Sequence, residues 1–187
     1  MTLTAVNGTQ PETGSTLRVL HKSGGVLDDR DFFLEALMPL KTQLYNFIRK
    51  AMNFHPDADD VFQETLLKGF RYLHSFNRER SFKTWIFTIA HNNVKDRFKP
   101  THYTEQLLAE EMEQLAVEEP GFNQEVREIY IAAGSLKARQ REVFFLYYYN
   151  EFTVMEIAGI TRLSRANVKF ILHQARNVIK KIVEVKQ

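Results

Sequence analysis

Apolar residues recur every three and four positions along two long stretches of the chain, and this spacing places them on one face of a helix. The first stretch covers residues 31–99 and contains two clear stripes: Phe33, Leu37, Leu40, Leu44, Phe47 and Ile48, then Val61, Phe62, Leu66, Phe70 and Leu73. Pro39 lies inside the first stripe, where it predicts a kink or the true start of that helix.

The breaks between helices are marked by residues that suit helix ends. Residues 55–57, His-Pro-Asp, favour a helix start, because proline and acidic side chains suit a first turn. A third helix is expected from Phe82 to about Phe98, where Pro100 stops it. The second helical stretch begins at Gln124, with breaks at Gly134–Ser135 and Asn150–Thr153.

Neither stretch shows strand-like alternation of useful length or an internal repeat. We therefore predict an all-α protein with two small helical domains joined by an acidic linker, the C-terminal domain containing a helix-turn-helix. The predicted parts are a flexible N-terminal arm at 1–25, a first domain at 26–100, the linker at 101–123 and a second domain at 124–187.

The helix-turn-helix is predicted from caps and spacing near the C-terminus. Thr153 and Glu156 form a capping-box pattern that starts a short helix, and a tight turn at residues 162–164 follows. Ser164 is a second cap, for a longer helix that buries Val168, Leu172, Ala175 and Ile179.

Seven outward residues of the longer helix carry chemistry suited to the DNA major groove. Arginine and lysine reach phosphates or guanine edges, asparagine and glutamine pair with adenine, and phenylalanine can meet a thymine methyl. An ordinary helical hairpin with a polar face is the alternative. The candidate contacts are Arg165, Asn167, Lys169, Phe170, His173, Gln174 and Arg176.

Charge is unevenly distributed, although the formal net charge of the 187 residues is only +2. Residues 77–99 carry six Lys/Arg against two Asp/Glu, and residues 153–187 carry seven against two. Residues 101–119 carry six Glu and no Lys or Arg. Two basic blocks joined by an acidic connector suggest two contacts with a polyanion, with solvated helix faces as the alternative.

Several function classes have no support in the sequence. The chain has no cysteine, which excludes disulfides and cysteine-based zinc sites. There is no glycine-rich phosphate loop or nucleophile elbow, and the six histidines do not have the spacing of metal ligands. We therefore expect no catalytic residues, no metal, no cofactor and no small-molecule substrate. The chain shows no apolar membrane span or secretory signal, so we expect a cytoplasmic protein.

Four segments resemble the sigma factors of bacterial RNA polymerase. The run ARQREVFFLYYYNEFTVMEIA from Ala138, continued by VKFILHQAR from Val168, is similar to the promoter-binding C-terminal domain. DADDVFQET from Asp57 is similar to the polymerase-docking helix, and SFKTWIFTIAHN from Ser81 to the promoter-melting segment. Because little lies between the two blocks, the resemblance is to the compact extracytoplasmic-function group.

The resemblance implies a non-enzymatic initiation factor that binds core RNA polymerase, through its clamp coiled coil and flap, and promoter DNA. The first domain would hold the minus-ten element as a single strand, and the second would hold the minus-thirty-five element as duplex. It also implies regulation by an anti-sigma factor. The implied polymerase contacts are Asp57, Asp60, Gln63 and Glu64. The implied minus-ten contacts are Asn77, Arg78, Arg80, Lys83, Asn92, Lys95 and Arg97.

Two other functions compete with this interpretation. A stand-alone helix-turn-helix regulator would bind duplex DNA without polymerase, usually as a dimer on two half-sites. A nuclease would use Asp57, Asp59, Asp60 and Glu64 as metal ligands. The chain also departs from the family pattern, with Arg162 where the turn often has glycine, and without the arginines common at Thr88, Ile171 and Gln174.

Overall fold

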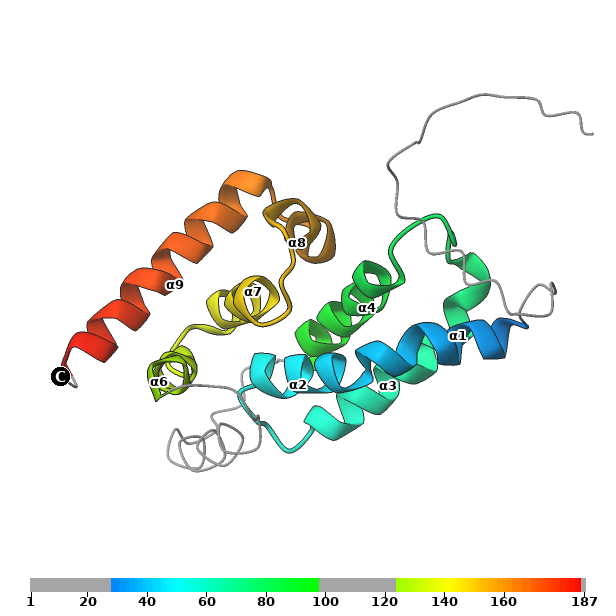
Figure 1. The fold of residues 1–187 in the computed structure, drawn as a ribbon, viewed down its shortest axis with the longest axis horizontal. Coiled ribbons are helices and arrows are strands. Elements are labelled where there is room, and N and C mark those ends of the chain that lie inside the picture. Colours follow the sequence, from blue (N-terminus) through cyan, green and yellow to red (C-terminus); the bar gives the residue numbers. More distant parts are fainter. Residues whose placement is uncertain (1–27, 98–123, 186–187) are drawn as a thin grey trace, which may run out of the picture.

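Helices of the computed structural model, which describes residues 28–97 and 124–185, gather into two groups that lie against one another (Figure 1). Within these ranges no strand is present, so the predicted all-α class is confirmed. The predicted N-terminal arm and acidic linker lie outside the described residues. No helix of the described part is long and apolar enough to cross a membrane.

The first group is built from four α-helices and two 3₁₀ turns. α3 and α4 pack side by side, α2 contacts both, and α1 continues the line of α2. The elements are α1 (Asp29–Leu37), η1 (Met38–Leu40), α2 (Lys41–Ala51), α3 (Ala58–Tyr72), η2 (Leu73–Ser75) and α4 (Phe82–Arg97).

Pro39 accounts for the break between α1 and α2. It lies in η1, the 3₁₀ turn that interrupts an otherwise continuous helical path. A proline at this point removes one backbone donor and crowds the preceding turn, so the chain tightens locally and then resumes as α2. The expected disturbance at Pro39 is thus a 3₁₀ turn, after which α2 begins.

A buried polar chain joins α3 to α4 within this group. The Asn93 Nδ2 atom donates to Thr65 Oγ1 at 3.0 Å, and the Thr65 hydroxyl donates to the carbonyl of Val61 at 2.7 Å. Lys68 Nζ donates to Asn93 Oδ1 at 2.6 Å. One turn beyond Thr65, Gly69 brings the backbones close, since a Cβ there would lie 2.6 Å from Ile86 Cδ1. The two helices are thus fixed by both hydrogen bonds and tight packing.

The second group contains α6 (Gln124–Ala133), α7 (Ala138–Tyr148), α8 (Val154–Thr161) and α9 (Arg165–Val185). α9 is the long helix at the edge of the molecule, and α6, α7 and α8 all pack against it (Figure 1). The apolar residues predicted to anchor α9, from Val168 to Ile179, are buried as expected. The fully buried side chains belong to one apolar core that runs through both groups: Leu44, Phe47, Ile48, Val61, Ile86 and Phe87 in the first, and Val143, Phe145, Leu146, Ile157, Ile160 and Val168 in the second.

The two groups meet along two helix pairs. α7 packs against α2, and α8 packs against α4. The contact therefore involves the middle of the first group and the start of the helix-turn-helix in the second.

Candidate polymerase and nucleic-acid interfaces

One face of α3 presents a row of exposed side chains at helical spacing. Asp60 is 75% exposed, Gln63 is exposed and Glu64 is 46% exposed. Leu67 continues the row one turn further and is 67% exposed, which is unusual for a large apolar side chain. Sequence reasoning missed Leu67, although its i, i+3, i+4, i+7 relation to Asp60 was visible. We call these four residues the α3 row.

Arg97 lies beside this row, although it was predicted to contact DNA. Its guanidinium reaches Asp57 at 3.1 Å and Asp60 at 3.5 Å. The end of α4 is thereby joined to the start of α3. All three side chains are largely exposed, so water weakens these ion pairs and they can exchange for a partner at small cost.

The loop between α3 and α4, residues 76–81, rests on an aromatic cluster. Phe76 and Phe82 are buried, and Trp85 packs on both with ring centroids 4.9 and 5.5 Å away. Phe32 of α1 contacts Phe76 and Phe82 from the other side. Trp85 therefore packs against the core beneath the loop, and Phe82 belongs to that core.

The predicted minus-ten residues occupy different settings around this loop. Arg78 lies over the Phe32 ring at 4.4 Å and pairs with Asp29 at 2.5 Å, so it braces the loop against α1. Asn77 accepts a hydrogen bond from the backbone of residue 79 at 2.9 Å and shapes the turn. Basic and polar side chains with exposed or partly exposed surface complete the set: Arg80, Asn92 and Lys95.

Lys83 faces the second group of helices. Its Nζ donates to the carbonyl of Asn150 at 2.8 Å and lies 4.7 Å from the centre of the Phe152 ring. Burial lowers the pKa of Lys83 from its ordinary value, partly offset by Glu151 and Glu156. In this conformation the cation is directed toward the second domain.

The helix-turn-helix has the predicted caps. The Thr153 hydroxyl accepts from the backbone N–H of Glu156 at 3.3 Å, and the Glu156 carboxylate accepts from the backbone N–H of Thr153 at 2.8 Å. Ser164 caps α9 by accepting from the backbone of Asn167 at 3.1 Å. Between them, Arg162 ends α8 in the left-handed conformation, with φ 56° and ψ 30°. Glycine is the residue best suited to that conformation.

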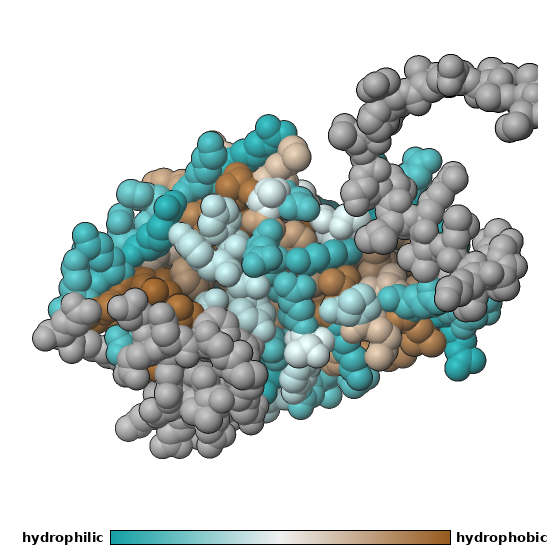
Figure 2. Space-filling model, in the orientation of Figure 1, coloured by the Kyte–Doolittle hydropathy of each residue, from teal (hydrophilic) through white to brown (hydrophobic). Residues whose placement is uncertain are grey.

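The outward side of α9 carries most of the predicted duplex contacts. Lys169 and His173 are exposed, and Phe170 is 59% exposed. Arg165 reaches back to the Met155 sulfur at 3.5 Å and so touches α8. Gln174 is half-buried and accepts a hydrogen bond from Gln140 at 3.3 Å, which positions it at the edge of this face. Figure 2 shows this hydrophilic side as a teal ridge along the position of α9.

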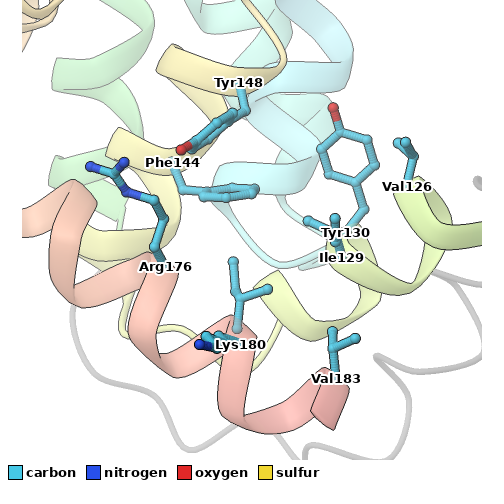
Figure 3. A pocket seen from close by; sticks show the side chains of 9 residues that line it. Val126, Ile129, Tyr130, Phe144, Tyr148, Arg176, Lys180 and Val183 are labelled. Carbon is cyan, nitrogen blue, oxygen red and sulfur yellow. The ribbon is translucent and has the colours of Figure 1, made fainter. Parts of the chain in front are cut away.

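An apolar groove of about 440 Å³ runs between α6, α7 and α9. Its walls include Ile129, Tyr130, Phe144, Tyr148 and Val183, and Figure 3 shows their side chains directed toward a shared space. Arg176, predicted as a DNA contact, and Lys180 stand on the α9 wall (Figure 3). The result is an apolar surface with a basic edge, which the sequence reading did not identify.

Carboxylates on α3 do not form a metal site. Asp57 and Asp60 are turned to Arg97, and Glu64 pairs with Lys68 at 2.8 Å. Across the described ranges, no group of three His, Asp or Glu side chains could hold a metal ion. The nuclease alternative therefore gains no support.

Two helical domains, one with an acidic exposed face on α3 and one with a helix-turn-helix, define a DNA-binding transcription factor of the sigma-70 type. Family models agree: Sigma-70 region 2 matches residues 37–101, and Sigma-70 region 4 matches residues 127–178. The chain belongs to the extracytoplasmic-function sigma factors, which direct promoter-specific initiation by RNA polymerase. Members of this family are typically non-enzymatic initiation factors that bind DNA.

Curated relatives support the same assignment, and two solved structures share the fold. The ECF sigma factor SigM of Bacillus subtilis is 29% identical over 142 residues, covering 73% of this chain and 86% of the relative. SigX of the same organism is 27% identical over 152 residues, covering 76% of this chain and 78% of the relative. The structure of RpoE with the anti-sigma factor NepR, from Bartonella quintana, has a TM-score of 0.65 at 22% identity. The match covers 84% of this chain and 99% of RpoE. The structure of CnrH in complex with the cytosolic domain of CnrY has a TM-score of 0.63 at 21% identity, and the match covers 84% of this chain and 91% of CnrH. These two likenesses concern the fold.

Proposed function

We propose that this sigma factor uses residues 26–100 as region 2, residues 101–123 as a linker and residues 124–187 as region 4. Region 2 docks on the polymerase clamp coiled coil and holds the minus-ten element as a single strand. Region 4 holds the minus-thirty-five element as duplex. The observation that carries the proposal is the pairing of an exposed α3 row in one domain with an exposed α9 face in the other.

The α3 row supports docking through its chemistry. Asp60, Gln63 and Glu64 offer acceptors to a basic partner helix, and Leu67 supplies an apolar contact at the end of the same face. Asp57 adds a further carboxylate through its pair with Arg97. Buried apolar contacts contribute most of the affinity of such an interface, whereas the surrounding charges set specificity and rate of association. Leu67 is therefore expected to matter as much as the carboxylates.

The minus-ten contacts are proposed around the 76–81 loop and α4. Extruding a base from the stack costs a few kcal/mol, and hydrogen bonds and stacking must offset that cost. The aromatic cluster beneath the loop gives it a rigid base, and Asn92 is the polar side chain proposed to meet the extruded base. Positive side chains around it, proposed to hold the strand's phosphates, are Arg80, Lys83 and Lys95.

The minus-thirty-five contacts are proposed on the first three turns of α9. A recognition helix reads base edges from its N-terminal residues while the first helix crosses the backbone. Lys169, Phe170 and His173 lie outward there, and Arg165 and Asn167 lie at the helix start. Gln174 and Arg176 flank this face and are proposed as peripheral contacts.

The α6–α7–α9 groove is proposed to receive the polymerase flap, the second polymerase partner implied by the family. An apolar floor with a basic edge suits an amphipathic helix, which is buried through its apolar face. We also propose that an anti-sigma factor restrains this chain, since the solved relatives CnrH and RpoE are in complex with CnrY and NepR. The protein is proposed to act in the cytoplasm and without catalysis.

A pull-down with purified bacterial core RNA polymerase, followed by run-off transcription from genomic fragments, tests the proposal. The wild-type chain is expected to bind core and produce new start sites. Leu67→Glu is expected to weaken core binding, because it places a charge where an apolar contact forms. Met38→Glu is the matched control, since Met38 is 65% exposed but lies in η1, outside the α3 row. Tight duplex binding without any core binding would favour the stand-alone regulator instead.

A further inference from the structure

We propose that Met155 is a redox-modification site: its oxidation to methionine sulfoxide by a peroxide captures Arg165 and weakens binding of the minus-thirty-five element. The chain has five methionines and no cysteine, so a thioether is the side chain that a peroxide oxidises most readily here. This inference rests on the proposed duplex contact of Arg165, but the oxidation of Met155 can be tested separately.

An oxidant in solution can reach the Met155 side chain. Met155 lies in the first turn of α8 and is 61% exposed. Of the other methionines in the described ranges, Met52 is only 3% exposed, whereas Met38 is 65% exposed and lies in η1 of the first domain. A peroxide is therefore expected to oxidise Met155 and Met38 well before Met52. Met38 thus provides a matched control, equally open but in the other domain.

The Met155 sulfur contacts the start of the helix that is proposed to read duplex DNA. Arg165 Nη2 donates to Met155 Sδ at 3.5 Å, across the turn at residues 162–164. Helix caps hold both ends of this contact in place, because a capping box starts α8 and Ser164 caps α9. The sulfur and the guanidinium are therefore kept within reach of each other by the backbone of the helix-turn-helix.

Oxidation changes the strength of the acceptor at this contact. The sulfur lone pair attacks one oxygen of hydrogen peroxide, so an S–O bond forms and the O–O bond breaks. The second oxygen leaves as hydroxide and takes the proton of the transferred hydroxyl to give water. Sulfur thereby loses the two electrons that the peroxide gains. A thioether sulfur is a weak acceptor, whereas a sulfoxide oxygen is polar and accepts a charge-assisted hydrogen bond from a guanidinium.

Capture of Arg165 withdraws a cation from the DNA. In the reduced protein Arg165 can exchange its weak contact with sulfur for a phosphate or a guanine edge. In the oxidised protein it must first leave a stronger acceptor, because the new oxygen is one bond from Met155 Sδ. One hydrogen bond of ordinary net strength corresponds to about a 2- to 10-fold change in affinity. The fold of α8 should persist, since the added oxygen lies on an exposed side chain.

The test uses the full-length protein, which is oxidised with hydrogen peroxide and freed of peroxide before core RNA polymerase is added. Peptide mass spectrometry gives the oxidised fraction of each methionine. Electrophoretic mobility shift of the holoenzyme on a promoter fragment gives the affinity. We expect the wild type and Met38→Leu to lose affinity by the factor above, and Met155→Leu to keep its affinity. Treatment with a methionine sulfoxide reductase should restore the wild type.

Two further variants isolate the capture of Arg165. Met155→Gln places a permanent amide oxygen near the guanidinium, so it should bind the promoter as weakly as the oxidised wild type without any oxidant. Arg165→Ala should bind more weakly from the outset, and oxidation of Met155 should then cause no further loss. The midpoint of thermal unfolding is expected to be the same before and after oxidation, because the modification acts on binding.

Each remaining outcome counts against a definite step. Complete oxidation of Met155 with unchanged promoter affinity would overturn the proposal, as would a Met155→Leu variant that is as sensitive to peroxide as the wild type. An equal further loss in oxidised Arg165→Ala would show that Arg165 is not captured and would also overturn it. An unoxidised Arg165→Ala variant that binds the promoter as well as the wild type would instead remove Arg165 from the duplex contacts of the proposed function.

Discussion

Arg162 provides a sharp test of the helix-turn-helix. It ends α8 with φ 56° and ψ 30°, a left-handed conformation in which the Cβ of a non-glycine residue is crowded by the backbone. That crowding costs about 1–2 kcal/mol in L-residues. Glycine removes it, but costs about 0.5–1 kcal/mol more conformational entropy on folding than alanine. We therefore expect Arg162→Gly to stabilise the second domain by roughly 0.5–1 kcal/mol, the middle of the difference between these two costs.

The measurement is the thermal and urea unfolding of the full chain, followed by far-ultraviolet circular dichroism. A gain of about 1 kcal/mol raises the Tm of a domain of this size by about 4–8 °C. Arg162→Ala is the matched control, because it removes the same charge and keeps the left-handed strain. A glycine variant no more stable than the alanine variant would refute the strain argument.

Three further substitutions test packing and DNA contact. Gly69→Ala should lower the free energy of unfolding by about 1–3 kcal/mol, because the alanine Cβ would lie 2.6 Å from Cδ1 of the buried Ile86. An unchanged midpoint of urea unfolding would contradict this. Asn92→Ala should weaken promoter opening, measured by permanganate footprinting, while core binding stays unchanged; normal opening would remove Asn92 from the site. Lys169→Ala should weaken binding of the minus-thirty-five element. If Lys169 touches only phosphate, the loss of affinity is similar across DNA sequences, and the slope of log affinity against log salt concentration falls by about one. A loss confined to one base pair would instead indicate a base contact.

Local signals made the helices predictable. Periodic apolar residues defined the buried faces, and the breaks coincided with residues that suit helix ends. Pro39 coincides with the 3₁₀ turn between α1 and α2, and Thr153 with Glu156 forms the capping box that starts α8. Each of these interactions joins residues within a few positions of one another. Sequence spacing therefore contained the necessary information.

Contacts between distant positions were not predictable in the same way. His91 and Glu142 are 51 positions apart, and Asn46 and Tyr149 are 103 apart. Nothing in local periodicity indicates which polar side chain of one domain meets which of the other. The groove between α6, α7 and α9 could not be predicted either, because it depends on how three helices cross and not on the apolar spacing of any one helix. A lysine is usually expected to be solvated, but Lys83 of the first domain donates a hydrogen bond to the Asn150 carbonyl of the second.

The hydrogen-bond chain between Thr65 and Asn93 has a mechanical consequence. Displacing α4 by one turn along α3 would leave the buried Asn93 amide without its hydrogen-bond partners in a tightly packed contact, at a cost of about 1–3 kcal/mol. We therefore expect α3 and α4 to move as one rigid unit. A polymerase bound to the outer face of α3, as proposed, would therefore also set the position and angle of α4. Docking on the proposed α3 row would thus also align α4, the helix that carries the proposed minus-ten contact Asn92.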